Sequence, residues 1–131
     1  MTPAPTVTIE TLRQLALALP EVTEQLCYGT PAFYVRRKLM ARVREDGETL
    51  AIKADYAERE FRIMANPAVF FVTDHYVGYP MMLVRLPVVE SEELRGLLEQ
   101  AWRMVAPKRL IREYDQLSVI SHQLSVRTTD D

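Results

Sequence analysis

The 131-residue chain has the length of one ordinary domain, and its 48% hydrophobic and 26% charged residues are typical of a globular protein. No stretch reaches the roughly 20 apolar residues of a membrane helix, and the start of the sequence lacks the pattern of a secretory signal. We therefore expect a cytoplasmic protein with no membrane partner. The single Cys27 excludes an intramolecular disulfide and a multi-cysteine metal site. The net charge of −2 does not favour a dedicated nucleic-acid binder, which usually carries a basic excess.

The first half of the chain predicts one helix followed by a series of strands. Thr8 caps a helix over about 9–19, and Pro20 ends it. The apolar period then changes to that of strands, at about 23–28, 33–36, 39–44 and 49–53. Asp46-Gly47 supplies the positive φ angles of a tight hairpin turn, whereas Arg37-Lys38 would strain one.

The second half predicts a short helix, further strands and a long helix. The short helix covers about 56–65, with Asp55 and Glu58 at the spacing of a capping box. A β-rich run, an aromatic loop and a strand follow, at about 69–73, 74–80 and 81–88. The long helix over about 92–106 has the apolar stripe of a core-facing helix, with Trp102 in its middle, so we expect Trp102 to be buried. Residues 110–117 are compatible with one more helix.

These elements predict a single α+β domain over residues 1–131, with a core at about 8–110 and a C-terminal extension at about 111–131. The expected architecture is an antiparallel β-sheet with helices packed on one face. A turn at Asp46-Gly47 pairs Val43 with Leu50 and Ala41 with Ile52. The inner face then carries Leu39, Ala41, Val43, Leu50 and Ile52. The outer face carries Phe33, Val35, Met40, Arg42, Arg44, Thr49, Ala51 and Lys53.

Basic side chains gather on this predicted outer face and at its turn, although the whole chain is acidic. Arg85 also points outward, because it alternates with Val84 and Leu86. In nucleic-acid-binding surfaces, basic residues contact phosphates and aromatic residues stack on bases. The alternative interpretation is an ordinary solvent-exposed outer face of the sheet. The candidates for nucleic-acid binding are Arg36, Arg37, Lys38, Arg42, Arg44, Lys53 and Arg85.

The aromatic loop at residues 73–80 is a second candidate site. His75, Tyr76 and Tyr79 lie within five positions of one another. They could line a pocket for a small molecule or a protein partner, or they could pin the loop to the core. The sequence leaves both interpretations open.

No arrangement of residues indicates catalysis, a metal or a cofactor. Asp74 and His75 are neighbours, but no nucleophile is associated with them, and His75 and His122 are too far apart in sequence to suggest a metal site. The glycines do not form a phosphate-binding loop. We therefore expect a non-enzymatic protein without catalytic residues, metal or cofactor.

Three separated segments resemble the MmcQ/YjbR family. They are Tyr28-Gly29-Thr30-Pro31-Ala32-Phe33, residues 70–76 with Gly78-Tyr79-Pro80, and residues 101–110. The resemblance covers about 8–110. It implies a fold similar to frataxin (the CyaY-like fold), with a "double wing" arrangement that has been compared with DNA-binding domains. Members of that family are commonly labelled DNA-binding proteins, a label that rests largely on structural analogy.

The resemblance transfers no catalytic residue, and it does not transfer iron binding, because the first helix offers only Glu10 where frataxin has an acidic helix. The leading hypothesis is a small binding protein whose basic face contacts DNA weakly. The alternative is a small-molecule-binding or interaction domain that uses loop 73–80. Monomer and homodimer both remain open, and the apolar side chains of a homodimer contact would be Leu117, Val119, Ile120, Leu124 and Val126.

Overall fold

The computed structural model describes residues 7–117, and its elements alternate as the sequence predicts. In chain order they are α1 (Ile9–Leu17), β1 (Val22–Cys27), β2 (Thr30–Val35), β3 (Lys38–Val43), β4 (Thr49–Lys53), α2 (Tyr56–Ala65), β5 (Phe70–Phe71), β6 (Met81–Arg85) and α3 (Ser91–Val105). A further helix covers residues 108–117. The segment 118–131, which holds most of the apolar residues of the predicted homodimer contact, lies outside the described residues.

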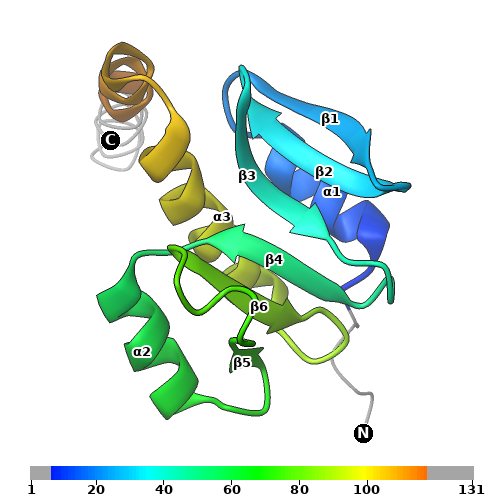
Figure 1. The fold of residues 1–131 in the computed structure, drawn as a ribbon. Coiled ribbons are helices and arrows are strands. Elements are labelled where there is room, and N and C mark those ends of the chain that lie inside the picture. The colour runs from blue at the N-terminus through cyan, green and yellow to red at the C-terminus, as the bar shows by residue number, and fades with distance from the viewer. Residues whose placement is uncertain (1–6, 118–131) are drawn as a thin grey trace, which may run out of the picture.

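The strands form one antiparallel sheet in the order β1-β2-β3-β4-β6-β5. Helices α1 and α3 lie together behind the sheet, and α2 lies beside its β5 edge (Figure 1). The predicted α+β fold is therefore confirmed. None of the helices in residues 7–117 has both the length and the apolarity that crossing a bilayer requires.

The hydrophobic core lies between the inner face of the sheet and helices α1 and α3. Trp102 of α3 is completely buried, as predicted, and its Nε1–H donates to the carbonyl of Pro20 at 2.9 Å. The ring of Tyr114, from the helix at residues 108–117, lies 4.9 Å from the Trp102 ring, between centroids. The last helix is thus packed on α3 by aromatic contact and by an ion pair of 2.7 Å between Arg103 and Asp115.

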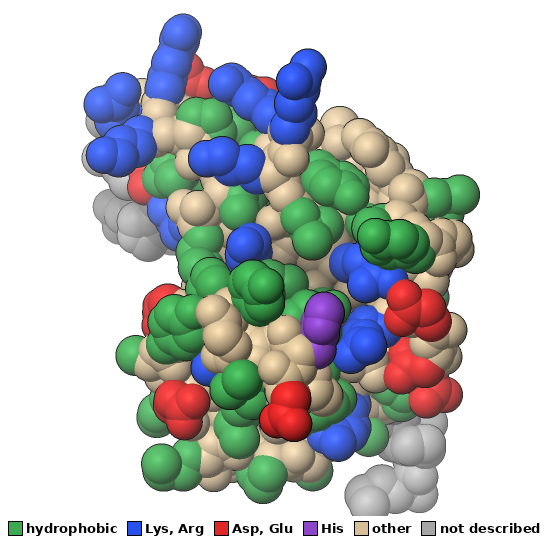
Figure 2. Space-filling model, in the orientation of Figure 1, with side chains coloured by type: hydrophobic (Ala, Val, Ile, Leu, Met, Phe, Trp, Pro, Cys, Tyr) green, Lys and Arg blue, Asp and Glu red, His purple; other side chains and the backbone are tan. Residues whose placement is uncertain are grey.

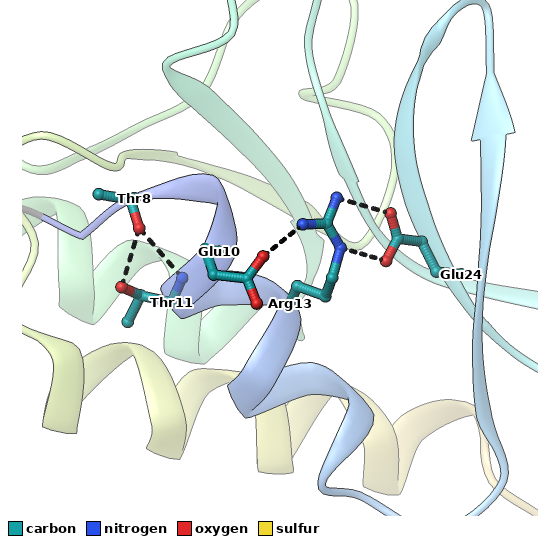
Figure 3. Close-up of polar contacts among 5 residues, drawn as sticks. All are labelled: Thr8, Glu10, Thr11, Arg13 and Glu24. Carbon is teal, nitrogen blue, oxygen red and sulfur yellow. Dashed lines mark hydrogen bonds and ion pairs between the residues drawn. The ribbon is translucent and has the colours of Figure 1, made fainter.

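Helix α1 begins at the predicted cap and is tied to β1 by a bidentate ion pair (Figure 3). Thr8 Oγ1 accepts from the backbone N–H of Thr11 at 3.1 Å. The Arg13 guanidinium donates to both carboxylate oxygens of Glu24 at 2.7 and 3.0 Å and to Glu10 at 2.7 Å. These carboxylates raise the pKa of Arg13 further above its ordinary value. Glu10 of α1 and Glu24 of β1 are therefore both engaged by one arginine.

The predicted register of β3 and β4 is confirmed, but their connection is longer than a two-residue turn. Val43 pairs with Leu50 and Ala41 with Ile52. The carboxylate of Asp46 accepts from the backbone N–H of Thr49 at 2.9 Å and from its hydroxyl at 2.7 Å. A four-residue loop forms because an Asp side chain that bonds the backbone ahead of it stabilises such a turn.

The predicted face of β2 was wrong, because β2 and β3 do not pair in the expected register: the pairing is displaced by one residue at Phe33 and by two residues at Tyr34 and Val35. Phe33 pairs with Ala41 and Tyr34 pairs with Leu39, which leaves Met40 as the extra residue of a β-bulge. The extra residue reverses the alternation of β3, so Met40 and Ala41 both face the core, and the one-residue displacement beyond the bulge places Phe33 there as well. Phe33 and Met40, with Val35, are consequently buried in the core instead of lying on the outer face.

The turn between β2 and β3 also differs from the prediction. Val35 pairs with Lys38, so the turn consists of Arg36 and Arg37 and not of Arg37 and Lys38. Arg36 adopts a φ of 57°, in the left-handed region that favours glycine. Leu39, predicted to face the core, is only half-buried at this end of the sheet.

The outer face is partly covered by the loop that precedes β6. A small second apolar cluster forms there from Ala51, Met81 and Leu83, and Phe71 and Tyr76 pack against it. This loop keeps water from the β4–β6 part of the face. The β4–β6 part of the outer face is therefore apolar and covered by this loop.

Candidate nucleic-acid interface

Four basic residues come together at one end of the sheet, which we call the basic end: Arg36, Arg37, Lys38 and Lys53. Strand β3 begins at Lys38 and the antiparallel β4 ends at Lys53, so both residues lie at the same end. The turn of Arg36 and Arg37 directly precedes Lys38. The antiparallel pairing of three strands thus converts separate positions in the sequence into one basic surface.

Most of the charge of the basic end is unpaired. Arg36 forms an exposed ion pair of 3.1 Å with Glu21. Within residues 7–117, Arg37, Lys38 and Lys53 take part in no ion pair within 4 Å. Arg37 and Lys38 are exposed and Lys53 is half-buried. These three cations are therefore available to an anionic partner without first breaking an internal contact.

An apolar groove runs between these cations and the C-terminal end of α3. It consists of two adjoining hollows of about 420 and 480 Å³, which share Lys38 and Val105. The first hollow is lined by Lys38, Leu39, Lys53, Pro80, Met104 and Val105. The second is lined by Val35, Arg36, Arg37, Lys38, Val105 and Pro107. Every residue of the basic end thus borders the groove, and the remaining lining residues are apolar.

The helix at residues 108–117 adds basic residues that the sequence-based prediction missed. Pro107 lines the groove, and Lys108 and Arg112 follow it in the helix at residues 108–117, exposed and without an ion pair to any described residue. Figure 2 shows Lys and Arg side chains gathered over the end of the molecule where the β2–β3 turn and the start of this helix lie in Figure 1. The proximity of these two segments depends on how α3 packs on the sheet, so the local sequence gave no signal for it.

Arg42 and Arg44, also predicted to bind nucleic acid, are engaged within the protein. Both form ion pairs with Glu45, and the Arg42 side chain is only 12% exposed. Burial acts to lower the pKa of Arg42, but the hydrogen bond and charge of Glu45 outweigh it and raise the pKa. The Arg42 guanidinium also lies over the Tyr28 ring and that of Arg44 over the Tyr76 ring, each 5.3 Å from the centroid. These two arginines chiefly stabilise the outer face.

Arg85 is exposed, as predicted, but lies away from the basic end. It pairs with Thr49, at the start of β4, whereas Lys53 is at the end of that strand. Its guanidinium stacks 4.0 Å above the centroid of the Phe71 ring. The seven predicted residues therefore divide into three groups: the four of the basic end, the pair Arg42 and Arg44 on the outer face, and Arg85.

The three candidates of the aromatic loop do not converge on one point. Tyr76 packs against the apolar cluster of the outer face. The His75 ring meets the Tyr76 ring edge-on at 4.8 Å between centroids, while His75 and Tyr79 are both exposed. This geometry favours the interpretation in which the aromatic side chains hold the loop to the sheet.

Arg59 of α2 is the buried residue that holds this loop in place, and the sequence did not single it out. Its side chain is 4% exposed. Its guanidinium donates to four backbone carbonyls, those of Tyr76 at 3.4 Å, Val77 at 3.1 Å, Tyr79 at 2.9 Å and Met81 at 3.1 Å. One buried cation thus adds four hydrogen bonds to the backbone turns of this loop.

The described residues offer no metal-binding cluster: within residues 7–117, no three His, Cys, Asp or Glu side chains come together as possible ligands. Glu10, Glu21 and Glu24 are instead held by Arg13 and Arg36.

Comparison with known proteins places the chain in a family. The family model described as YjbR matches residues 17–104. The uncharacterized proteins Rv2570 of Mycobacterium tuberculosis and Mb2600 of Mycobacterium bovis are each 38% identical to it over 69 residues, which are 52% of this chain and 54% of each relative. The chain thus matches about half the length of these curated relatives.

A solved structure has the same fold. The crystal structure of Deinococcus radiodurans protein DR2400, with the family-model domain DUF419, superposes with a TM-score of 0.66 at 24% identity, over 82% of this chain and 84% of that one. The match of the family model over most of the sheet and α3, together with this fold, leads to one conclusion. The chain belongs to the YjbR family.

Proposed function

We propose that this protein is a small non-enzymatic DNA-binding domain that contacts phosphates through the basic end. The observation that carries the proposal is that Arg37, Lys38 and Lys53 lie beside one groove and form no ion pair with any of the described residues, 7–117. Arginine and lysine that are already paired with carboxylates would have to break those pairs to bind a phosphate. Cations without such partners can bind phosphates, and release the counterions condensed on DNA, without breaking an ion pair within the protein.

The acidic balance of the whole chain limits the affinity without preventing binding. The net charge of −2 repels DNA at long range, but physiological salt screens this repulsion beyond about 8–10 Å. At contact distance the local field of the basic end dominates, reinforced by Lys108 and Arg112. We expect a dissociation constant in the micromolar range or weaker, which is usual for sequence-independent binding.

The proposal is tested by titrating a fluorescently labelled DNA hairpin that carries a single-stranded tail, at several salt concentrations. About four phosphate contacts give a log–log salt slope of roughly −3 to −4. Replacing Lys38 and Lys53 by Ala should weaken binding about tenfold or more at low salt and reduce the slope by about 2.

A matched control removes the same charge elsewhere. Arg85 and Arg95 are both exposed and lie outside the groove lining, so the double variant Arg85→Ala, Arg95→Ala keeps the net charge of the test variant. It should change the affinity less than about twofold. Absence of binding to the hairpin at low salt would rule out DNA binding, and equal losses in both variants would rule out the basic end as its site.

A further inference from the structure

The apolar groove is a feature that phosphate binding alone does not require, because cations on an open surface are enough to bind duplex DNA. Its lining includes Leu39, Met104 and Val105, and Pro80 and Pro107 complete the apolar part. Met104 is 43% exposed although it is a large apolar side chain. The two hollows fall within the roughly 300–1,000 Å³ of small-ligand sites. The groove can therefore accommodate an apolar group about as large as a base.

Duplex and single-stranded DNA differ in what they present to such a groove. In a duplex the base faces are stacked inside, and the outer surface consists mainly of phosphates, sugars and groove edges. In a single strand the flat apolar faces of the bases are free, and proteins that bind single strands combine a basic track with contacts to those faces. A basic rim around an apolar groove matches the single strand on both counts.

We infer that the DNA bound by this protein is single-stranded, with one unstacked base lying in the groove against Met104 and Val105 and the adjoining phosphates on Lys38 and Lys53. This inference rests on the proposed function and specifies its substrate. Lys38 and Lys53 border the first hollow together, so the cations and the apolar floor belong to one site. Among the described residues, no aromatic side chain lines the groove. Contact with aliphatic side chains and a polarizable methionine accepts any base, so we expect little sequence preference.

The first test compares three labelled probes of about 12 nucleotides at one salt concentration. They are a mixed-sequence single strand, the duplex of that strand with its complement, and a strand of the same length with abasic sugars throughout. The single strand should bind at least about fivefold more tightly than the other two. The abasic strand keeps every phosphate, so its weaker binding would isolate the contribution of the bases.

The second test removes apolar surface without changing charge. Met104→Ser should weaken binding of the single strand about threefold or more and leave its salt slope unchanged, because no phosphate contact is lost. Met64→Ser is the matched control, since Met64 is 84% exposed on α2 and does not line the groove. Because both methionines are exposed, both variants should keep the melting temperature of the parent.

The possible outcomes separate this inference from the proposed function. If none of the probes and no hairpin binds at low salt, the proposed function itself fails. If the duplex or the abasic strand binds as tightly as the single strand, the protein binds DNA by charge alone and the inference is overturned. Unchanged single-strand binding by Met104→Ser would also overturn it.

Discussion

The arginines of the outer face and the cations of the basic end are close in sequence but differ in what surrounds them. Arg42 is largely buried, is paired with Glu45 and lies over the Tyr28 ring. Lys38, at the beginning of the same strand, is exposed and unpaired among residues 7–117. The difference arises because Arg42 lies within β3 in contact with the Tyr28 ring and Glu45, whereas Lys38 lies at the sheet end, where no carboxylate of the described residues comes within 4 Å of it.

This comparison shows why a count of basic residues does not locate a binding surface. Arginine has a planar fork and a long apolar stem, so it readily becomes part of a packed structure. Arg42 and Arg59 both do so, one by an ion pair and the other by hydrogen bonds to carbonyls. Arg37, Lys38 and Lys53 of the basic end form no ion pair with any residue in 7–117. Substitutions in the two regions should therefore affect different properties.

The largest effect is expected for Arg59→Ala, which removes the buried anchor of the aromatic loop. Four carbonyls, including those of Tyr79 and Met81, would lose their charged donor within a largely buried site. We expect a loss of roughly 2–4 kcal/mol in the free energy of unfolding, measured by urea denaturation. Arg59→Lys supplies one compact ammonium group in place of the planar guanidinium, so this variant should recover only part of the lost stability. A loss below about 0.5 kcal/mol would show that the loop does not depend on this arginine.

A smaller effect separates the two regions directly. Arg42→Ala should lower the free energy of unfolding by about 1–2 kcal/mol, because a largely buried stem and a paired charge are lost. The same change should alter DNA affinity less than about twofold. Arg37→Ala should do the reverse, with stability within about 0.5 kcal/mol of the parent and weaker DNA binding. The comparison between the regions is wrong if both substitutions weaken binding equally.

The smallest effect concerns Asp46, whose carboxylate closes the β3–β4 loop. The hydroxyl of Thr49 and two backbone N–H groups hold the pKa of Asp46 below its ordinary value. A carboxyl whose folded pKa is depressed contributes stability above its unfolded pKa, and this contribution is lost as the pH falls through the folded pKa. At pH 7, Asp46→Asn should therefore destabilise the protein, by less than about 1 kcal/mol because the side chain is exposed.

The pH dependence provides the check. Unfolding measured from pH 7 down to about pH 3 should show the difference between parent and Asp46→Asn shrinking below about pH 4. Asp46→Ala also removes the hydrogen-bond acceptor, so a larger share of its deficit should persist in acid. If the deficit of Asp46→Asn were the same at pH 3 and pH 7, the charge of Asp46 would not be the cause.

Much of the fold could be predicted because its signals are local. The cap at Thr8, the buried stripe around Trp102 in α3 and the pairing of Val43 with Leu50 all follow from the spacing of nearby residues. Family membership was also evident from short segments in the correct order, and the match over residues 17–104 confirms it. The β2–β3 register was not predictable in this way. The bulge at Met40 buries two consecutive side chains, Met40 and Ala41, which breaks the alternation expected of a strand. No turn residue nearby indicates that a bulge forms there.

The candidate site shows the same division between sequence and structure. The sequence by itself determined that Arg36, Arg37, Lys38 and Lys53 are basic residues near strand ends, and that Arg42, Arg44 and Arg85 accompany them. The tertiary structure decided which of these charges stay free, because the Tyr28 ring that Arg42 lies over and the apolar α3 residues beside Lys38 come from other elements. The groove exists only because α3 ends at Val105 beside the sheet end, and the contact between such distant segments depends on packing, which no local pattern encodes.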